Sequence, residues 1–220
     1  MTRSMGDAIH DNVAALARVP GLQLVGGYVT GSADILWTPA DWALFPRQLH
    51  VTIDQGYTGS PVPTAIVRDV EPGAWTPAAA VNRNGWTAAR PTIYCDRSDL
   101  SRAGGVLASG WRGDLWLAYP GWQPGQALPA APGCNYVAVQ NQLNVANAYD
   151  LSVVLDDTWP IGGTVLTAWQ RGSVQVLYSP AGQLQISGVG QDNCLYLANL
   201  NPDFTTSPPQ QVSAPLTFTS

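Results

Sequence analysis

Seven short apolar runs recur along the first 160 residues of this 220-residue chain, and they constrain its fold more than any other feature. The runs cover 22–29, 49–56, 64–71, 90–96, 114–120, 135–142 and 149–155. Most are nearly continuous in apolar residues and end in a polar residue or glycine, which is typical of parallel strands buried on both faces. Because functional groups gather where such strands end, the polar residues at these ends are candidates for a site.

Helix signals lie between several of these runs. Residues 38–47 and 76–85 each begin with threonine followed by proline, and 98–110 begins with a serine cap and ends in glycine. The alternation predicts an α/β fold, either a (β/α)8-type (TIM-like) barrel or an open parallel sheet. The interval between 49–56 and 64–71 is too short for a helix, so we expect an abbreviated barrel.

The chain is expected to have three parts. In 7–19, Ile9, Val13 and Leu16 share one helical face, which predicts an amphipathic helix. Beyond residue 160, period-two alternation broken by turn sequences such as PAGQ predicts consecutive antiparallel strands. The expected parts are an N-terminal helix or arm (1–21), a barrel (22–160) and a small antiparallel β-rich extension (161–220).

Composition excludes several functional classes. All ten basic residues are arginines set against 15 acidic residues, and they form no basic stripe, so nucleic acid is not an expected partner. Three scattered cysteines form no metal-binding pattern, and no cofactor is expected. His10 and His50 have no suitable nucleophile nearby, which argues against a hydrolase triad. No apolar run approaches the length of a membrane span, and no signal peptide is evident.

Glu71 is the only glutamate of the chain, and it lies two residues after Asp69 at the end of the run 64–71. Side chains at i and i+2 of a strand point to the same face, so both carboxyl groups are expected at one mouth of the barrel. Neighbouring carboxylates raise each other's proton affinity, and apolar surface such as Trp75 can keep one of them protonated. The pair is therefore a candidate for acid catalysis. The alternative is a strand end whose carboxylates bind loop amides and Arg68.

Further polar and aromatic residues occupy strand ends. Asp54 ends VTID, Asp96 ends TIYCD, and Asp150 lies near the start of the last run. Side chains suited to a polyhydroxylated ligand lie at other strand ends: Tyr28, Tyr94, Tyr119, Gln140 and Gln142. Taken singly, each also fits a solvated loop or a satisfied core position. Asp156 and Asp157 are interpreted as a solvated turn.

The order and spacing of these motifs resemble the later strands of glycoside hydrolase family 25 lysozymes and their actinobacterial and phage glycoside-hydrolase-like relatives. The motifs are VRDVEPGAW, RPTIYCD, DLWLAYPGW, YVAVQNQ and YDLSVV, and the resemblance covers roughly residues 22–160. It implies a (β/α) barrel, often with fewer helices than strands, that cleaves the β-1,4 bond after N-acetylmuramic acid in peptidoglycan.

The resemblance also implies roles for individual residues. Glu71 matches the catalytic acid, Asp69 the stabilising carboxylate of the same D-x-E motif, and Asp150 the acid of the last strand. Tyr94, Trp116 and Gln140 match positions of the substrate cleft. Family members begin with a strand G-x-D whose aspartate belongs to the catalytic set, whereas the first strand expected here, GGYVTG, has no aspartate.

The leading hypothesis is a peptidoglycan-directed glycoside hydrolase of lysozyme type. Glu71 would protonate the glycosidic oxygen, and Asp69, with Asp150 or Asp54 nearby, would stabilise the transition state or activate water. The expected sugar contacts are Tyr28, Trp75, Tyr94, Trp116, Tyr119 and Gln140. A phage-encoded enzyme without a signal peptide is expected to be virion-associated or released, and any other such enzyme to be cytoplasmic.

The alternative is a non-catalytic glycan-binding or virion structural module on a degenerate barrel. Its C-terminal β region would dock to other virion proteins or to copies of the same chain. Bacterial cell-wall glycan is the expected partner of the enzyme and of a glycan-binding module. An open cleft that Glu71 and Asp69 face favours the enzyme, and a plugged mouth favours the binding module.

Overall fold

The computed structural model of the chain describes residues 3–57 and 59–160 and, in the C-terminal region, the backbone of four strands. Contacts within the chain divide it into two units, Met1–Pro160 and Ile161–Ser220. None of the helices in the described residues has the length and apolar character needed to cross a bilayer.

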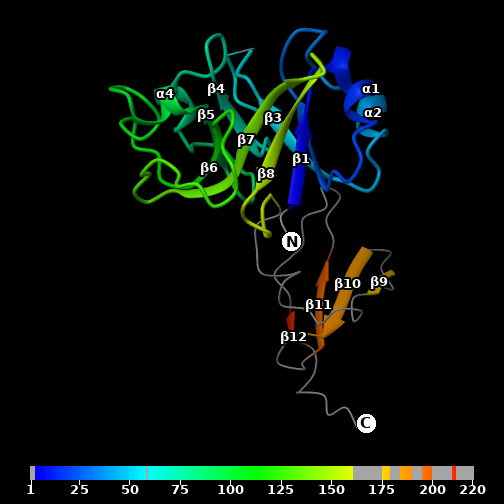
Figure 1. Ribbon diagram of the computed structural model, residues 1–220. Helices are drawn as coiled ribbons and strands as arrows, with labels where there is room; N and C mark the ends of the chain where they lie inside the picture. Colours follow the sequence, from blue (N-terminus) through cyan, green and yellow to red (C-terminus); the bar gives the residue numbers. More distant parts are fainter. Residues whose placement is uncertain are drawn as a thin grey trace. The chain divides into compact units, whose positions relative to one another are not determined.

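Eight strands form a closed barrel in chain order (Figure 1). They are β1 (Arg3–Asp7), β2 (Leu24–Tyr28), β3 (Leu49–Asp54), β4 (Val67–Val70), β5 (Thr92–Asp96), β6 (Asp114–Ala118), β7 (Asn135–Val145) and β8 (Tyr149–Val154). Strands β1 to β7 are parallel, and β8 closes the barrel by pairing antiparallel with both β7 and β1. The predicted barrel is confirmed, and each of the seven apolar runs overlaps one of its strands.

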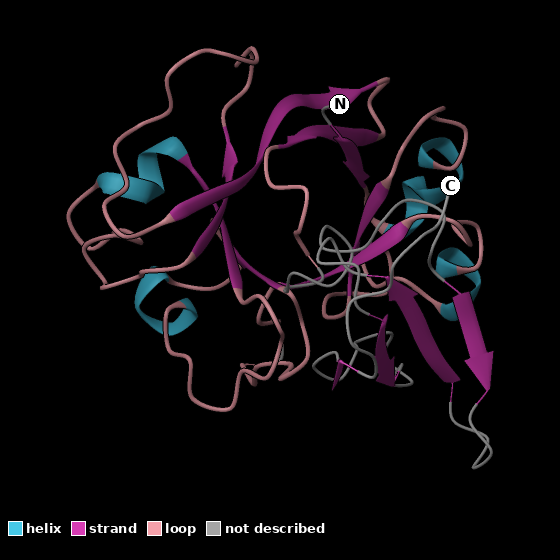
Figure 2. Ribbon diagram, turned by 90° about the horizontal axis from the view of Figure 1, so that it is seen from below, coloured by secondary structure: helices cyan, strands magenta, loops and turns pink. Residues whose placement is uncertain are grey.

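The structure supports a barrel but not the full (β/α)8-type arrangement, because the described residues contain only four α-helices of four or five residues each. They are α1 (Val13–Leu16), α2 (Pro39–Trp42), α3 (Pro77–Ala80) and α4 (Arg97–Ser101). Figure 2 shows these short helices among long loops around the barrel. Proline or positive-φ glycine follows within a few residues of three helix ends, at Pro46, Gly85 and Gly104, and limits how far these helices can extend.

The helix starts agree in part with the sequence. Thr38 and Thr76 are N-caps, as expected, and their side chains accept hydrogen bonds from the amides of Asp41 and Ala79. The cap of α4 is Asp96 and not Ser98, because the Asp96 carboxylate accepts hydrogen bonds from the backbone amides of Ser98 and Asp99.

Residues 3–7, expected in an N-terminal arm, form the first strand of the barrel. Strand β1 pairs with β2, with Met5 opposite Leu24, and with β8 on its other side. The helix predicted for 7–19 is reduced to a 3-10 turn (His10–Asn12) followed by α1. Among the described residues, no helix lies between 54 and 67. Strand β1 is the eighth strand, which the closed barrel needs.

Packing explains why such a polar segment is a strand. A Cβ atom added at Gly6 would lie 2.5 Å from Leu16 Cδ1, so the absent side chain lets α1 pack directly on β1. Val13 and Leu16 are buried against Val25 of β2, in a cluster that covers this side of the barrel. The expected apolar helical face thus exists, but it stabilises a strand immediately before it in the chain.

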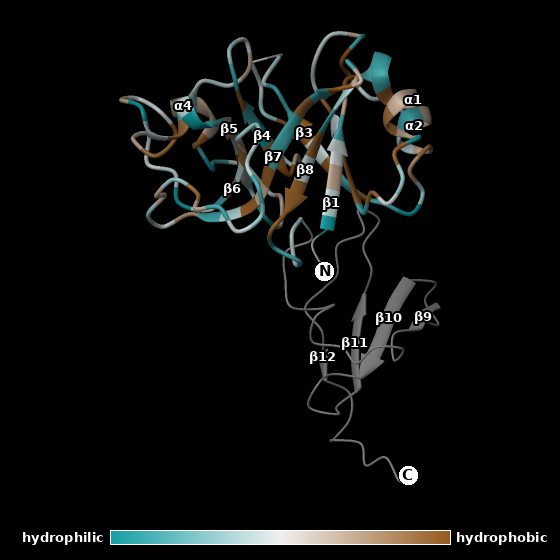
Figure 3. Ribbon diagram, in the orientation of Figure 1, coloured by the Kyte–Doolittle hydropathy of each residue, from teal (hydrophilic) through white to brown (hydrophobic). Residues whose placement is uncertain are grey.

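Apolar side chains fill the barrel and cover two of its sides. The interior cluster includes Met5, Leu24, Val51, Val67, Trp116 and Val154. A second cluster joins α3 and α4 to the outer faces of β5 and β6, and a third joins α1 to β2. Figure 3 shows hydrophobic residues concentrated along strands such as β3 and β8, whereas many loop segments are hydrophilic.

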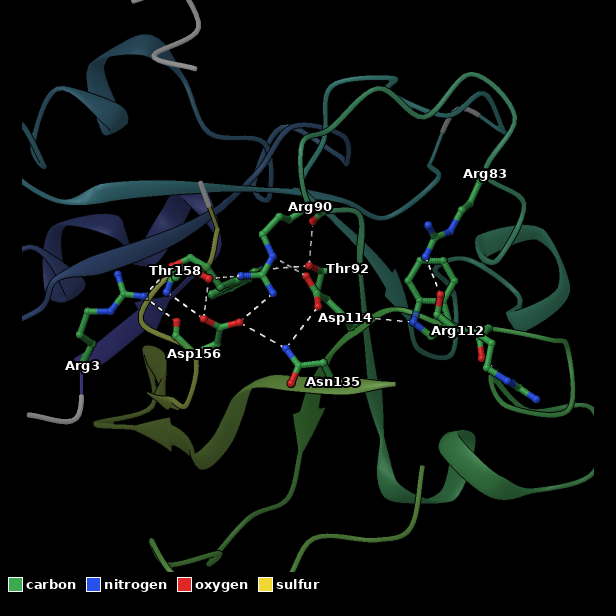
Figure 4. Close-up of polar contacts among 11 residues, drawn as sticks. Arg3, Arg83, Arg90, Thr92, Arg112, Asp114, Asn135, Asp156 and Thr158 are labelled. Carbon is green, nitrogen blue, oxygen red and sulfur yellow. Dashed lines mark hydrogen bonds and ion pairs between the residues drawn. The ribbon is translucent and has the colours of Figure 1, made fainter. Parts of the chain in front are cut away.

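A network of ion pairs holds together the barrel end opposite to the carboxyl ends of the parallel strands (Figure 4). Arg90, just before β5, contacts Asp114 at 2.7 Å and Asp156 at 2.8 Å and donates to Thr158 at 2.8 Å. Burial opposes ionisation of Asp156, but hydrogen bonds from Arg90 and Thr158 outweigh it and lower the pKa of this carboxyl. Asp156 is therefore part of a structural network, and its interpretation as a solvated turn is wrong.

Arg90→Met is expected to lower the free energy of unfolding by about 3 kcal/mol, because it leaves two largely buried carboxylates without their cation. Chemical denaturation followed by tryptophan fluorescence measures this change. Arg47→Met removes the same charge from an exposed arginine that has no ion pair in the described part of the chain, and should leave the midpoint unchanged. Equal midpoints for the two variants would contradict the structural role of Arg90.

The C-terminal unit contains a four-stranded antiparallel sheet in the order β12-β11-β10-β9. Its strands are β9 (Gln175–Tyr178), β10 (Leu184–Val189), β11 (Leu195–Asn199) and β12 (Gln210–Gln211). The antiparallel pairing agrees with the period-two alternation of the sequence in this region.

Candidate active site

A cleft of about 690 Å³ opens at the carboxyl ends of the parallel strands. Its wall includes Tyr28 at the end of β2, Glu71 after β4, Tyr94 in β5 and Gln140 in β7. Asp150 joins them from β8, whose antiparallel direction brings its first residues to the same end. The structure thus gathers polar side chains from β2, β5, β7, β8 and the residue after β4 around one opening.

Asp69 and Glu71 lie at different depths at the end of β4. Val67 points into the barrel and the alternation of β4 gives Asp69 the same direction, whereas Glu71 is the first residue after the strand and lines the cleft. Asp69 is 1% exposed, whereas Glu71 is exposed on the cleft wall. Glu71 can therefore reach a molecule in the cleft, and Asp69 lies beneath it.

The surroundings of this pair favour protonation. Burial, and then the charge of Glu71, raise the pKa of Asp69 well above its ordinary value, against a hydrogen bond from Gln55. One Asp69 oxygen, Oδ1, has no hydrogen-bond partner among the described residues. The cleft walls desolvate the Glu71 carboxyl and raise its pKa, and a hydrogen bond to Tyr94 opposes this shift. The pair therefore retains protons at a pH at which isolated carboxyl groups would have lost them.

Asp7 is a further acid of this mouth that the sequence analysis missed. It ends β1, lies opposite Asp150 across the β1–β8 pair, and is 4% exposed. Its other neighbour is Gly26 of β2, where an added Cβ atom would lie 2.9 Å from Asp7 Cβ. The absent side chain at Gly26 makes room for the carboxyl group. A glycine inside an apolar strand indicates such a close approach and was the available signal.

Gln140 links three strands at the floor of the cleft. Its Nε2 donates to both oxygens of Asp7 at 3.4 Å and to Asp150 Oδ2 at 3.2 Å. Its Oε1 accepts from the Tyr94 hydroxyl at 2.6 Å. The second oxygen of Asp150 accepts from the amide of Asn144 at 2.6 Å. These contacts fix two carboxyl groups and one phenol in a single arrangement.

Burial raises the pKa of four other groups at this mouth, whereas at Asp96 it is outweighed by hydrogen bonds from Ser98 and Asp99, which lower the pKa. Burial raises the pKa of Asp7 well above its ordinary value, with Asp150 as the second cause and the hydrogen bond from Gln140 opposing. Burial also raises the pKa of Asp150. For Tyr28 and Tyr94, burial first and the surrounding carboxyl groups second raise the phenol pKa, so both hydroxyls remain neutral hydrogen-bond donors.

Besides Asp69, three predicted site residues do not line the cleft: Asp54, Trp75 and Trp116. Asp54 points out of the barrel, since Ile53 points in, and it accepts hydrogen bonds from Thr30 Oγ1 and from the amides of Gly56 and Val62. The structure thus commits both Asp54 oxygens to holding loops, which leaves no access to a ligand. Asp54 is fully buried.

The two tryptophans proposed as sugar contacts also have packing roles. Trp116 is 1% exposed, fills the barrel interior and donates from Nε1 to Ser152 Oγ at 3.0 Å. Trp75 packs against Gly56, where an added Cβ atom would lie 2.6 Å from its ring, and the Arg68 guanidinium lies 5.4 Å from its ring centroid. Tyr119 does line the cleft.

Among the described residues, no three histidine, cysteine, aspartate or glutamate side chains are grouped so that they could hold a metal ion. The arrangement is instead suited to proton transfer. It presents a solvent-accessible carboxyl group with a raised pKa, Glu71, beside buried carboxyl groups and neutral phenols.

No protein-family model and no curated protein matches the sequence. Among solved structures, the chain is similar to the CTP1L endolysin, whose crystal structure is described as revealing how its activity is regulated by a secondary translation product. The two share 14% sequence identity at a TM-score of 0.43, over 70% of this chain and 67% of that chain. The assignment of the site rests on the geometry of the cleft and not on this likeness.

Proposed function

We propose that the chain is a peptidoglycan-directed glycoside hydrolase of lysozyme type in which Glu71 is the general acid. The observation that carries the proposal is the position of Glu71, whose carboxyl group has a raised pKa and faces an open cleft two residues beyond the buried Asp69. An acid whose pKa is raised in this way keeps its proton to a higher pH than an isolated glutamate and can deliver it to a leaving group.

In the proposed reaction, Glu71 protonates the glycosidic oxygen as the bond between this oxygen and the anomeric carbon breaks. Positive charge develops at the anomeric carbon, and Asp69 stabilises it in the state of the pair in which Asp69 is ionised and Glu71 carries the proton. Water then adds to the anomeric carbon and gives its proton to a carboxylate of the pair. Asp7 and Asp150 contribute to the negative potential of the mouth from the opposite side.

The cleft suits a polyhydroxylated ligand in size and chemistry. Its volume of about 690 Å³ lies in the range of small-molecule sites. Tyr28, Tyr94 and Gln140 supply neutral polar groups on its wall, and Tyr119 adds an aromatic face. The motifs that resemble family 25 lysozymes support a β-1,4-linked glycan of N-acetylglucosamine and N-acetylmuramic acid.

Asp7 weakens the case for a non-catalytic module. That alternative is favoured by a first strand without an aspartate, but the first strand of the barrel is β1, which ends in Asp7. Within residues 3–57 and 59–160 the cleft is also open at Glu71, so the N-terminal residues do not plug the mouth as they could in a module that had lost activity.

Incubation of the full chain with purified bacterial peptidoglycan tests this proposal. New reducing ends and soluble muropeptides are the expected products, and a boiled sample provides the control. Binding of the protein to the insoluble glycan without any rise in reducing ends would contradict the hydrolase and identify a glycan-binding module.

A further inference from the structure

Arg97 is the single basic residue of the cleft wall, which also carries three acidic residues, Glu71, Asp96 and Asp150. It is the first residue of α4, directly after β5, and it is exposed. Its guanidinium carbon lies 4.3 Å from the ring centroid of Tyr119, which follows β6 and lines the same cleft. The cation is therefore stacked on an aromatic ring at the edge of the proposed active site.

The Tyr119 ring is itself held in place. Its backbone amide donates to the Gln140 carbonyl oxygen at 2.9 Å, and its hydroxyl accepts from Gln126 Nε2 at 3.1 Å. Stacking on a fixed ring restricts the Arg97 side chain while leaving the edges of its guanidinium plane free to donate. Such an edge matches the two oxygens of a carboxylate.

The carboxylates near Arg97 have other partners. Asp96 caps α4 by accepting from the amides of Ser98 and Asp99, and the Asp99 carboxylate pairs with Arg102. Asp150 is bound by Asn144 and Gln140. Within residues 3–57 and 59–160, Arg97 forms no ion pair with any of them, so its charge remains available to a ligand.

We propose that Arg97, held against Tyr119, is a specificity-determining residue that binds a carboxylate of the substrate. The acidic side chains of the wall would repel an anionic glycan, so one uncommitted cation in the same wall selects for a carboxylate placed at its position. A neutral glycan would gain nothing from Arg97. The inference rests on the proposed function for the identity of the glycan, where the stem peptide carries carboxylates and the lactyl group of N-acetylmuramic acid carries a free carboxylate wherever no stem peptide is attached to it.

Isothermal titration calorimetry tests the inference without requiring turnover. Glu71→Gln and the double variant Glu71→Gln/Arg97→Gln are titrated with three ligands: a muropeptide with its stem peptide, a peptide-free peptidoglycan fragment, and a chitin oligomer without carboxylates. Losing a charge-assisted, bidentate contact should weaken binding of a carboxylate-bearing ligand by about tenfold or more. Affinity for the chitin oligomer should not change.

The three ligands distinguish the source of the carboxylate. A loss with the peptide-free fragment identifies the lactyl group, and a loss confined to the muropeptide identifies the stem peptide. Arg97→Lys keeps the positive charge but lacks the planar guanidinium group, so it should bind carboxylate-bearing ligands more tightly than Arg97→Gln and less tightly than Arg97. Arg47→Gln, also in the Glu71→Gln background, removes the same charge elsewhere and should have no effect.

An equal loss for all three ligands, or no loss for any of them, would overturn the inference, as would failure of both carboxylate-bearing ligands to bind the Glu71→Gln protein. Failure of the proposed function is a separate result, because it appears as absent reducing ends with the wild-type chain whatever the affinities of the Arg97 variants.

Discussion

Replacement of Glu71 by glutamine is expected to lower the rate of peptidoglycan hydrolysis by about 10²- to 10⁴-fold, the usual contribution of a general acid. Glutamine has nearly the same size but cannot deliver a proton to the glycosidic oxygen. Loss of turbidity in a cell-wall suspension and formation of reducing ends both measure the rate.

The same substitution should leave the melting temperature close to that of the wild type, because Glu71 is exposed and forms no ion pair within the described residues. Asp11→Asn, at another exposed acid outside the cleft wall, serves as the control and should retain full activity. An unchanged rate of lysis with Glu71→Gln would contradict the assignment of Glu71 as the general acid.

Asp69→Asn is expected to lower activity by at least about 100-fold and, at the same time, to raise the melting temperature at neutral and higher pH. Asp69 is almost fully buried and has one oxygen without a partner in the described part of the chain, so its ionised form is poorly accommodated. Asparagine cannot ionise. A residue retained for function at the expense of stability behaves in this way.

The pH dependence of this effect follows from the direction of the pKa shift. The folded-state pKa of Asp69 is raised, chiefly by burial, so the protonated carboxyl stabilises the fold below the ordinary aspartate value. This stability is lost as the pH rises through the raised folded-state pKa. The difference in melting temperature between Asp69→Asn and the wild type should therefore be small at acidic pH and should grow as the pH increases.

Asp54→Asn provides a matched control, since Asp54 is also a buried aspartate at a strand end. Its oxygens accept three hydrogen bonds from loop groups, and an amide nitrogen in place of one oxygen would face a donor. This variant should therefore melt at a lower temperature than the wild type. Destabilisation of the same size by Asp69→Asn and Asp54→Asn would contradict a functional role for Asp69.

Much of the barrel could be predicted because its strands are buried on both faces and appear as apolar runs. Strand β1 could not, since Met5 is its only large apolar residue and its neighbours in sequence show a helical period. Its formation depends on contacts that are distant in the chain, with β2, with β8, and with α1 through Gly6.

The direction in which a site residue points, into or out of the barrel, was predictable wherever the two-residue period of a strand decides it. Period two places Asp69 on the same face of β4 as Val67, which points into the barrel, and Glu71 follows the strand and lines the cleft. In β3, Val51 and Ile53 point into the barrel. Because directions alternate along a strand, Asp54 points out of it. The depth of a side chain along the barrel was not predictable, because it depends on how far neighbouring strands are shifted along one another. This shift places Trp116 inside the barrel and Tyr94 at the cleft.

Mass spectrometry of the products formed in heavy-oxygen water tests the central claim most directly. Hydrolysis by the wild-type chain should release muropeptides that end in a reducing N-acetylmuramic acid with one heavy oxygen at the anomeric carbon, and Glu71→Gln should release none. Intact glycan strands, or heavy oxygen found only in stem-peptide or lactyl carboxyl groups, would contradict a glycosidase with Glu71 as its acid.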